Sequence, residues 1–163
     1  MRDGLHSIPF QLLDQQCNDY IFSDQVVVKV KLILISISRQ SEFAPLVFDI
    51  RTETSVAAPD YLRGTPGEFE QGNCRNGEPR WECPILARVE RWNLYSAEDE
   101  EARDLKVIFR AAKSFKLTNA FDKDGQPIYE IQGKAVIKFD DRLSQNLRMS
   151  RSRGERSLHL DSF

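Results

Sequence analysis

Histidine is scarce in this sequence, and the motifs of the common enzyme classes are missing. The chain has two histidines, His6 and His159, and both lie near its ends. A Ser-His or Cys-His nucleophile pair needs a histidine on a rigid element, which neither position favours. The P-loop, GxGxxG, GxSxG and HExxH patterns do not occur. The sequence therefore predicts no catalytic residues and no cofactor, and a protein that is not an enzyme.

Cysteine is also scarce, with only Cys17, Cys74 and Cys83. A zinc site would need all three together with His6 or His159, and none of the spacings resembles C-x₂-C. Cys74 and Cys83 flank a turn signal and can close a disulfide if the compartment is oxidising. Free thiols are the favoured interpretation, and no metal site is predicted.

Long hydrophobic segments are absent. The longest apolar run covers residues 26–37, whereas a transmembrane helix needs roughly 20 apolar residues. The first 17 residues lack the continuous apolar segment of a secretory signal, so the expected location is the cytoplasm. With 40% hydrophobic residues, 29% charged residues and a net charge of −2, the composition is typical of an ordinary globular chain that does not enter membranes.

The apolar run Val26–Ile37 predicts a long β-strand around which the rest of the chain packs. It is rich in Val and Ile and contains no Gly or Pro. Its even positions begin apolar, whereas its odd positions carry Lys29 and Lys31 before turning apolar at Ile33. The buried side is therefore expected to change near residues 32–34. This pattern favours a strand that bends from one sheet into another, in a bent antiparallel barrel or an orthogonal sandwich.

Two helical segments are predicted beside these strands. Ser7 can cap a short N-terminal helix over residues 8–17, because Pro9 is tolerated in a first turn and apolar residues recur at helical spacing. Ser96 with Asp99 has the form of a capping box, so one or two helical turns are expected there.

Further strands are predicted by alternation of apolar and polar residues. Residues 46–56 alternate cleanly, and residues 85–95 change their apolar side near Glu90, which predicts a bulge or bend. The runs 105–117 and 127–139, separated by the turn dipeptide Asp124-Gly125, predict a hairpin with Leu105, Phe115 and Leu117 on one face. Gly133 inside the second run predicts a bulge or a close backbone approach.

The sequence predicts one β domain over residues 1–141 and a tail over residues 142–163. Within the domain, residues 57–84 contain four Pro and four Gly and form a long irregular excursion, anchored by apolar side chains and folded back on the domain or on another subunit. The tail is rich in Arg and Ser and shows no core pattern.

Charge is unevenly distributed along the chain. Residues 1–104 carry 11 Lys and Arg against 18 Asp and Glu, whereas residues 105–163 carry 12 against 7. This asymmetry fits either a basic surface for an anionic partner or attraction between the two parts inside the fold.

The leading functional prediction is a structural or accessory subunit of a larger assembly. It follows from the missing catalytic residues, the long excursion and the apolar end of the tail, which can add as a strand or enter a groove of a protein partner or a second copy. The predicted contact residues are Arg148, Arg151, Arg153, Arg156, Leu158, Leu160 and Phe163.

The alternative prediction is a small β-protein that binds RNA or single-stranded DNA. Basic residues on the solvent-exposed face of the C-terminal hairpin can hold phosphates, and a neighbouring aromatic side chain can hold bases. The residues in question are Lys106, Arg110, Lys113, Phe115, Lys116, Lys134 and Lys138. An enzyme with an unrecognised carboxylate site is a third interpretation, and the sequence indicates no small-molecule substrate.

Overall fold

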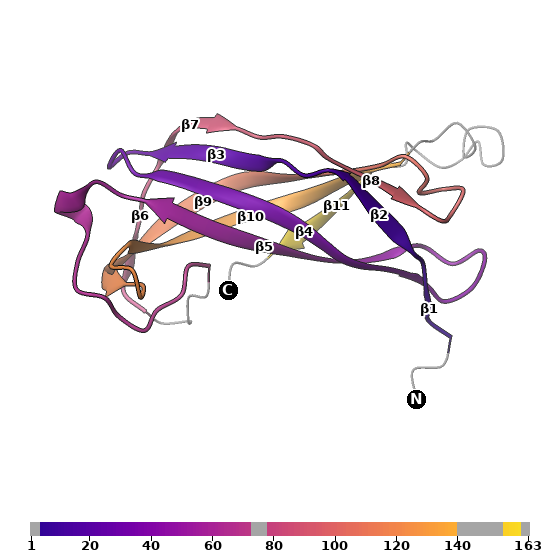
Figure 1. Cartoon of the computed structure of the whole chain (residues 1–163), viewed down its shortest axis with the longest axis horizontal. Helices are drawn as coiled ribbons and strands as arrows, with labels where there is room; N and C mark the ends of the chain where they lie inside the picture. The colour runs from indigo at the N-terminus through magenta and orange to yellow at the C-terminus, as the bar shows by residue number, and fades with distance from the viewer. Residues whose placement is uncertain (1–3, 73–77, 140–154, 161–163) are drawn as a thin grey trace.

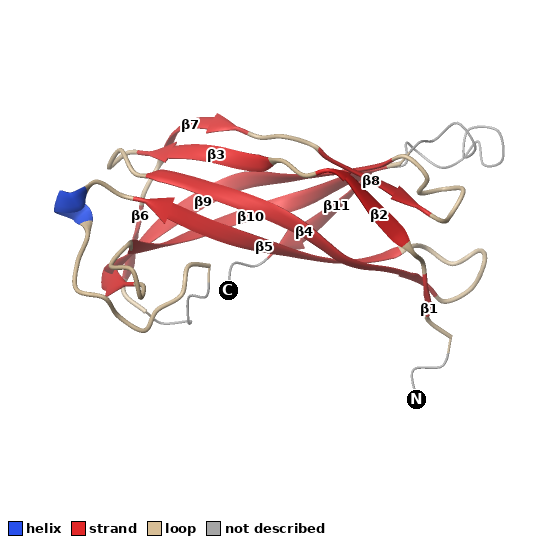
Figure 2. Ribbon diagram, viewed as in Figure 1, coloured by secondary structure: helices blue, strands red, loops and turns tan. Residues whose placement is uncertain are grey.

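The computed structural model describes residues 4–72 and 78–139 in full and the backbone of residues 155–160. Two antiparallel sheets pack face to face (Figure 1). Sheet A contains β1 (His6–Ser7), β3 (Cys17–Phe22), β4 (Val27–Arg39), β5 (Val47–Ala57) and β7 (Ile85–Val89). Sheet B contains β2 (Phe10–Asp14), β6 (Arg80–Glu82), β8 (Asn93–Ala97), β9 (Leu105–Phe121), β10 (Pro127–Lys138) and β11 (Glu155–Leu160). The one helical element among these residues is the 3₁₀ turn η1 (Asp60–Leu62), shown in blue in Figure 2.

The mainly β, antiparallel fold class is confirmed, but the predicted barrel is wrong. In the described part of the chain, no strand is shared by the two sheets, so each sheet stays open. The long strands of both sheets follow the longest axis of the molecule and do not cross at right angles (Figure 1). The chain changes sheets between β7 and β8 through residues 90–92, which are not part of a strand. A closed barrel would instead need hydrogen-bonded strands all the way round.

Strand β4 lies in the middle of sheet A, as the apolar run predicts. It pairs with β5 along one edge and with β3 and β1 along the other. Its buried side changes from Leu34 to Ile37, slightly later than predicted. The cause is a bulge at Ile35, which has no partner in β5 and points to solvent. The extra residue reverses the alternation, so β4 changes its buried side while remaining in one sheet.

The hairpin of β9 and β10 is confirmed, and so is the irregularity at Gly133. Gly133 pairs with Ala111 and the preceding residue pairs with Lys113, which leaves Ala112 as an extra residue in β9. A Cβ at Gly133 would lie 2.6 Å from the Phe109 ring, so glycine permits the close approach of the two strands.

This bulge also corrects the predicted faces of β9. Before it, odd positions such as Leu105 face the core; after it, the core side passes to even positions such as Ser114. Phe115 and Leu117 therefore lie on the outer side of sheet B, opposite to the prediction. Leu117 packs there in a small separate cluster with Ala120 and Ile128.

The predicted N-terminal helix is wrong, because residues 10–14 form strand β2. This strand pairs antiparallel with β8, and the Phe10 ring packs edge-on against Tyr95, with centroids 5.9 Å apart. Leu13, one of the apolar residues whose spacing predicted the helix, is exposed. Pairing with an available sheet edge outweighs the intrinsic preference of so short a segment.

The predicted helical turns after Ser96 are wrong as well. Ser96 lies in β8, and the acidic residues that follow form the turn between β8 and β9. Within this turn the Asp99 side chain accepts a hydrogen bond from the Glu101 amide. Arg39 of β4 lies 3.1 Å from the Asp99 carboxylate and 2.8 Å from that of Glu101. The acidic run therefore holds the turn against sheet A and does not start a helix.

The core lies between the two sheets. Phe22 of β3 and Tyr129 of β10 meet edge to face, with ring centroids 5.0 Å apart. Val, Leu and Ile side chains from the inner faces of both sheets surround this pair, and burial of such apolar area is the main force holding the layers together. Fully buried members include Tyr20, Val28, Ile37, Val107, Ala135 and Ile137.

The described part of the excursion, residues 57–72 and 78–84, folds back on its own domain, which is one of the two predicted placements. The Gly64 amide donates to the Gly125 carbonyl in the turn between β9 and β10, at 2.9 Å. Further along, the Gln71 amide group donates to the Pro127 carbonyl at 2.5 Å and accepts from the Tyr129 amide at 3.2 Å. These contacts cover the turn end of the hairpin.

Part of the predicted tail belongs to sheet B. Strand β11 pairs antiparallel with β10 over residues 133–138, so its backbone extends the sheet by one strand. The backbone of residues 155–160 is thus integrated into the domain predicted to end at residue 141.

Candidate nucleic-acid interface

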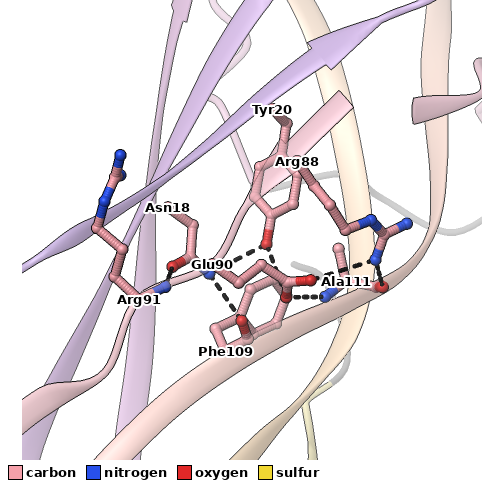
Figure 3. Close-up of polar contacts among 7 residues, drawn as sticks. All are labelled: Asn18, Tyr20, Arg88, Glu90, Arg91, Phe109 and Ala111. Atoms are coloured by element: carbon pink, nitrogen blue, oxygen red, sulfur yellow. Dashed lines mark hydrogen bonds and ion pairs between the residues drawn. The ribbon is translucent and has the colours of Figure 1, made fainter. Parts of the chain in front are cut away.

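A gap in the edge of sheet B explains a cluster of polar side chains between the sheets. Strand β8 pairs with residues 105–107 of β9, and β6 pairs with residues 115–117. Between these two strands, side chains supply the missing partners (Figure 3): Asn18 donates to the Phe109 carbonyl at 2.7 Å. Buried backbone groups need such partners, because leaving them unpaired is costly.

The backbone of Ala111 is satisfied by two further side chains. Its amide donates to a Glu90 carboxylate oxygen at 3.0 Å, and its carbonyl accepts from Arg88 at 2.6 Å (Figure 3). Tyr20 donates its hydroxyl to the same Glu90 oxygen at 3.3 Å. Burial, and next the charge of Glu90, raises the pKa of Tyr20. These bonds fix the segment in which the chain passes from sheet A to sheet B.

This fixed segment sets the direction of Trp92. The Arg91 amide donates to the Asn18 side chain at 2.8 Å. Asn93 is buried, and its side-chain oxygen accepts a hydrogen bond from the Gln16 amide at 2.7 Å. Because side chains alternate along an extended chain, Trp92 points to the outer face of sheet B.

Four basic side chains lie on the same outer face as Trp92. Lys106 lies opposite Lys138, and Arg110 lies opposite Lys134, in the pairing of β9 with β10. All four are exposed, and none forms an ion pair within the part of the chain that the structure describes. They mark the corners of a rectangle about 5 Å across the strands and about 13 Å along them. We call these four residues and Trp92 the basic face.

The indole ring lies between the Lys106–Lys138 pair and the Arg110–Lys134 pair. The Lys138 ammonium is 5.2 Å from the ring centroid, and the Arg110 guanidinium is 6.0 Å from it. Both distances are within cation–π range. Ile108 and Val136, which occupy the row between the basic residues, are buried although they face outward. The basic face therefore combines four exposed cationic side chains with a tryptophan ring that contacts two of them.

The other residues predicted for nucleic-acid binding are placed differently. Lys113 is exposed on the same outer side, beyond the bulge. Phe115 is also on this side, but Arg80 lies over its ring at 5.1 Å and pairs with Glu130. Lys116 points to the opposite side, so it does not join the basic face.

Lys116 instead belongs to a structural cluster on Asp24. Its ammonium lies 3.2 Å from an Asp24 carboxylate oxygen, and the side chains are 15% and 14% exposed. The hydroxyl of Tyr129 donates to the same oxygen at 2.6 Å. This cluster connects the turn between β3 and β4 with sheet B.

Trp92 is the residue of the candidate site that sequence reasoning missed. The available signal was the alternation of residues 85–95, which places Trp92 and Leu94 on the side opposite to Ile85. That signal could not be connected to the basic residues, because the pairing of β8 with β9 brings them together only in the folded chain.

The residues predicted for protein contact lie mostly outside the described part of the chain. This holds for Arg148, Arg151, Arg153 and Phe163. The register of β11 places Arg156, Leu158 and Leu160 opposite Ile137, Ala135 and Gly133 of β10. Their role in binding a partner stays a prediction.

The cysteines can be described in part. Cys17 and Cys83 are not in disulfides, and Cys74 lies outside the described residues. Burial raises the pKa of the Cys83 thiol, whose sulfur lies 3.5 Å from the Ser23 hydroxyl. In residues 4–72 and 78–139, no three His, Cys, Asp or Glu side chains gather in a way that could hold a metal ion.

Comparisons with family models, with curated proteins and with solved structures find no match to this chain. Among the described residues, no helix has the length and apolar character needed to cross a membrane. The functional argument therefore depends on the geometry described above.

Three buried tyrosines predict a loss of stability at alkaline pH. Burial raises the pKa of Tyr20, Tyr95 and Tyr129 above the usual value of about 10. Below pH 10 both folded and unfolded chains keep these protons, so stability is unaffected. Above it the unfolded chain loses them first, and the free energy of unfolding is expected to fall by up to about 1.4 kcal/mol per pH unit for each tyrosine.

Urea unfolding followed by tryptophan fluorescence, repeated at increasing pH, measures this slope. Tyr129→Phe is expected to start from a lower stability and to show a shallower decline above pH 10. A stability that stays constant as the pH rises past 10 would rule out the raised pKa values.

Proposed function

We propose that this chain binds single-stranded nucleic acid on the basic face and catalyses no reaction. The observation that supports this most directly is the pairing of like charges across β9 and β10. Lys106 stands opposite Lys138, and Arg110 stands opposite Lys134. Like charges directly opposite each other destabilise a sheet. A sequence that keeps two such pairs on one face of the sheet loses stability there, and binding of an anion offsets that loss.

The shape of the surface favours a single strand. It presents a half-buried tryptophan on the outer face of a sheet, and no helix among the described residues is present to enter a groove of a duplex. Unpaired bases stack on aromatic rings exposed on sheets, while basic side chains at the border hold the phosphates. A duplex would present its phosphates to the same surface but hide its bases from Trp92.

Fluorescence polarisation with labelled poly-U and poly-dT oligonucleotides tests this proposal. The wild-type chain is expected to bind at low salt and to weaken steeply as salt is added, because binding releases counterions. Lys134→Gln/Lys138→Gln removes two phosphate contacts. This variant is expected to bind at least tenfold more weakly and to lower the slope of log K against log salt by roughly 1.4.

Lys29→Gln/Lys31→Gln is the matched control, because it removes the same charge from the outer face of sheet A. It is expected to bind like the wild type. If the wild type fails to bind either oligonucleotide at low salt, the proposal is wrong. Equal weakening by both double variants would mean that only net charge matters, which also contradicts a site on the basic face.

A second candidate function is the predicted role as a structural or accessory subunit. The specific observation in its favour is an apolar row on the outer face of sheet A, where Ala87, Ile21, Val27 and Ala57 are exposed neighbours on four strands. Contiguous exposed apolar surface is typical of a contact site for another protein. The free thiol of Cys83 fits the cytoplasm, which remains the proposed compartment.

The hydrodynamic mass and the captured partners of the full chain, of Ile21→Ser/Val27→Ser and of a truncation to residues 1–142 test this second candidate. Loss of a partner in the serine variant would support contact through sheet A, whereas loss only in the truncation would support contact through the tail. If both variants behave like the full chain, neither surface is the contact site.

A further inference from the structure

Strand β5 is an edge strand of sheet A, and within the described chain it has a neighbouring strand on one side only. Over residues 47–57 it pairs with β4, and no second strand of the described chain pairs with it (Figure 1). It contains neither Gly nor Pro. Edge strands of this length usually carry a device that prevents pairing with another chain, such as Pro, a bulge or an inward-pointing charge. The one bulge in this pair lies in β4 and not in β5.

The residue pattern of β5 is complementary to itself when read in the reverse direction. Around Thr52, Arg51 mirrors Glu53, and further out Phe48 mirrors Val56. Arg51 and Glu53 are both exposed and form no ion pair within the described residues. A twofold axis through Thr52 sets these complementary positions opposite one another, and between them it sets Ile50 opposite Thr54 and Asp49 opposite Ser55.

We propose that two copies of this chain associate through β5, antiparallel, with the twofold axis at Thr52. Arg51 of each copy then faces Glu53 of the other, which gives two cross-strand ion pairs. On the core side Phe48 faces Val56. The two A sheets become one continuous sheet, and the open edge of β5 is hydrogen-bonded along its whole length.

Other registers are less favourable. An axis at Arg51 or at Glu53 places the same charge opposite itself. An axis at Ile50 pairs Asp49 with Arg51, but it uses only residues 47–53 and leaves the rest of β5 unpaired. Axes between residues would set outward side chains against inward ones, which the pleat forbids. Only the axis at Thr52 uses the full length of the strand with opposite charges facing.

One described residue of the excursion lies near the centre of β5. Gly72 of the excursion lies on the Thr54 side of the strand, where a Cβ on the glycine would be 3.7 Å from the Thr54 hydroxyl. Arg51 and Glu53 point away from that side, because odd and even positions alternate. The dimer surface is on a different sheet from the basic face, so this inference is independent of nucleic-acid binding.

Charge reversal with rescue tests the dimer in the full-length chain. Sedimentation velocity is expected to give twice the chain mass of 18.8 kDa for the wild type. Arg51→Glu and Glu53→Arg each place like charges opposite one another and are expected to be monomeric. The double variant restores both ion pairs in reversed order and is expected to be a dimer again.

Disulfide trapping tests the register. Thr52→Cys places the new thiol at the axis, opposite its own copy, and is expected to give a covalent dimer under mild oxidation. Ile50→Cys is the control and is expected to give much less. A wild type that remains a monomer at high concentration would overturn the proposal. So would single reversals that remain dimers, a double variant that stays monomeric, or equal crosslinking at both positions.

Discussion

Replacing Asp24 with alanine is expected to lower the free energy of unfolding by about 3–5 kcal/mol, because breaking a buried ion pair leaves an uncompensated charge. One Asp24 oxygen accepts from Tyr129 at 2.6 Å and lies 3.2 Å from the Lys116 ammonium. The other oxygen accepts from the Val26 amide at 3.2 Å. The alanine variant leaves all three donors without their acceptor, in a site where Lys116 is only 15% exposed.

Urea unfolding measures this loss, and two further variants separate its causes. Asp24→Asn keeps an acceptor oxygen but removes the charge, so an intermediate loss is expected. Adding Lys116→Met to Asp24→Ala removes the ammonium group that has lost its partner, and is expected to recover part of the stability. A loss below about 1 kcal/mol in Asp24→Ala, in the range of an exposed pair, would show that the cluster does not hold the two sheets together.

Replacing Glu90 with alanine is expected to cost about 2–4 kcal/mol, because two donors lose their acceptor and an unsatisfied buried donor costs about 1–3 kcal/mol. The donors are the Ala111 amide at 3.0 Å and the Tyr20 hydroxyl at 3.3 Å. Glu90 also pairs with Arg88, 3.3 Å away. The change therefore removes one of the three side chains that supply partners in the gap between β6 and β8.

Hydrogen exchange identifies the site of this effect, while chemical unfolding gives its size. The Ala111 amide is expected to exchange faster in Glu90→Ala than in the wild type. Glu82→Ala, an exposed carboxylate on β6, is the control and is expected to change stability by less than about 0.5 kcal/mol. If Glu90→Ala and Glu82→Ala are equally stable, the gap in sheet B is not held by Glu90.

The sequence predicted the long strands of the core, although two of them contain bulges. The valine and isoleucine residues of β4 and the hairpin of β9 and β10 were found because β-branched residues alternate with polar ones over a long stretch. The change of buried side in β4 was also visible. Its cause, a bulge at Ile35, was not, because an inserted residue and a turn into another sheet leave the same pattern.

Segments that depend on a distant partner were predicted wrongly or missed. Residues 10–14 became a strand because β8 offers an edge to pair with. The acidic turn after Ser96 depends on Arg39, nearly 60 residues earlier in the chain. The role of Asp24 depends on Tyr129 in the same way. Local propensity carries no information about such partners, so these errors follow from topology.

The candidate site was predicted in part for the same reason. Four basic residues of β9 and β10 were identified because hairpin alternation fixes which side chains share a face. Phe115 and Lys116 were assigned with them, but the extra residue Ala112 reverses the alternation beyond it, so Lys116 points to the opposite side, whereas Phe115 is on the outer side with Arg80 over its ring. Trp92 joins the basic face through the pairing of β8 with β9, which no local pattern reveals.

Photocrosslinking tests the central claim most directly. A single-stranded oligonucleotide carrying 5-bromouracil is irradiated with the full-length chain, and the modified tryptic peptides are identified by mass spectrometry. We expect the main crosslink in the peptide of residues 92–103, which begins with Trp92, and we expect it to disappear with Lys134→Gln/Lys138→Gln at the same protein concentration. Crosslinks confined to sheet A or to residues 140–163, with the Trp92 peptide unmodified, would contradict binding on the basic face.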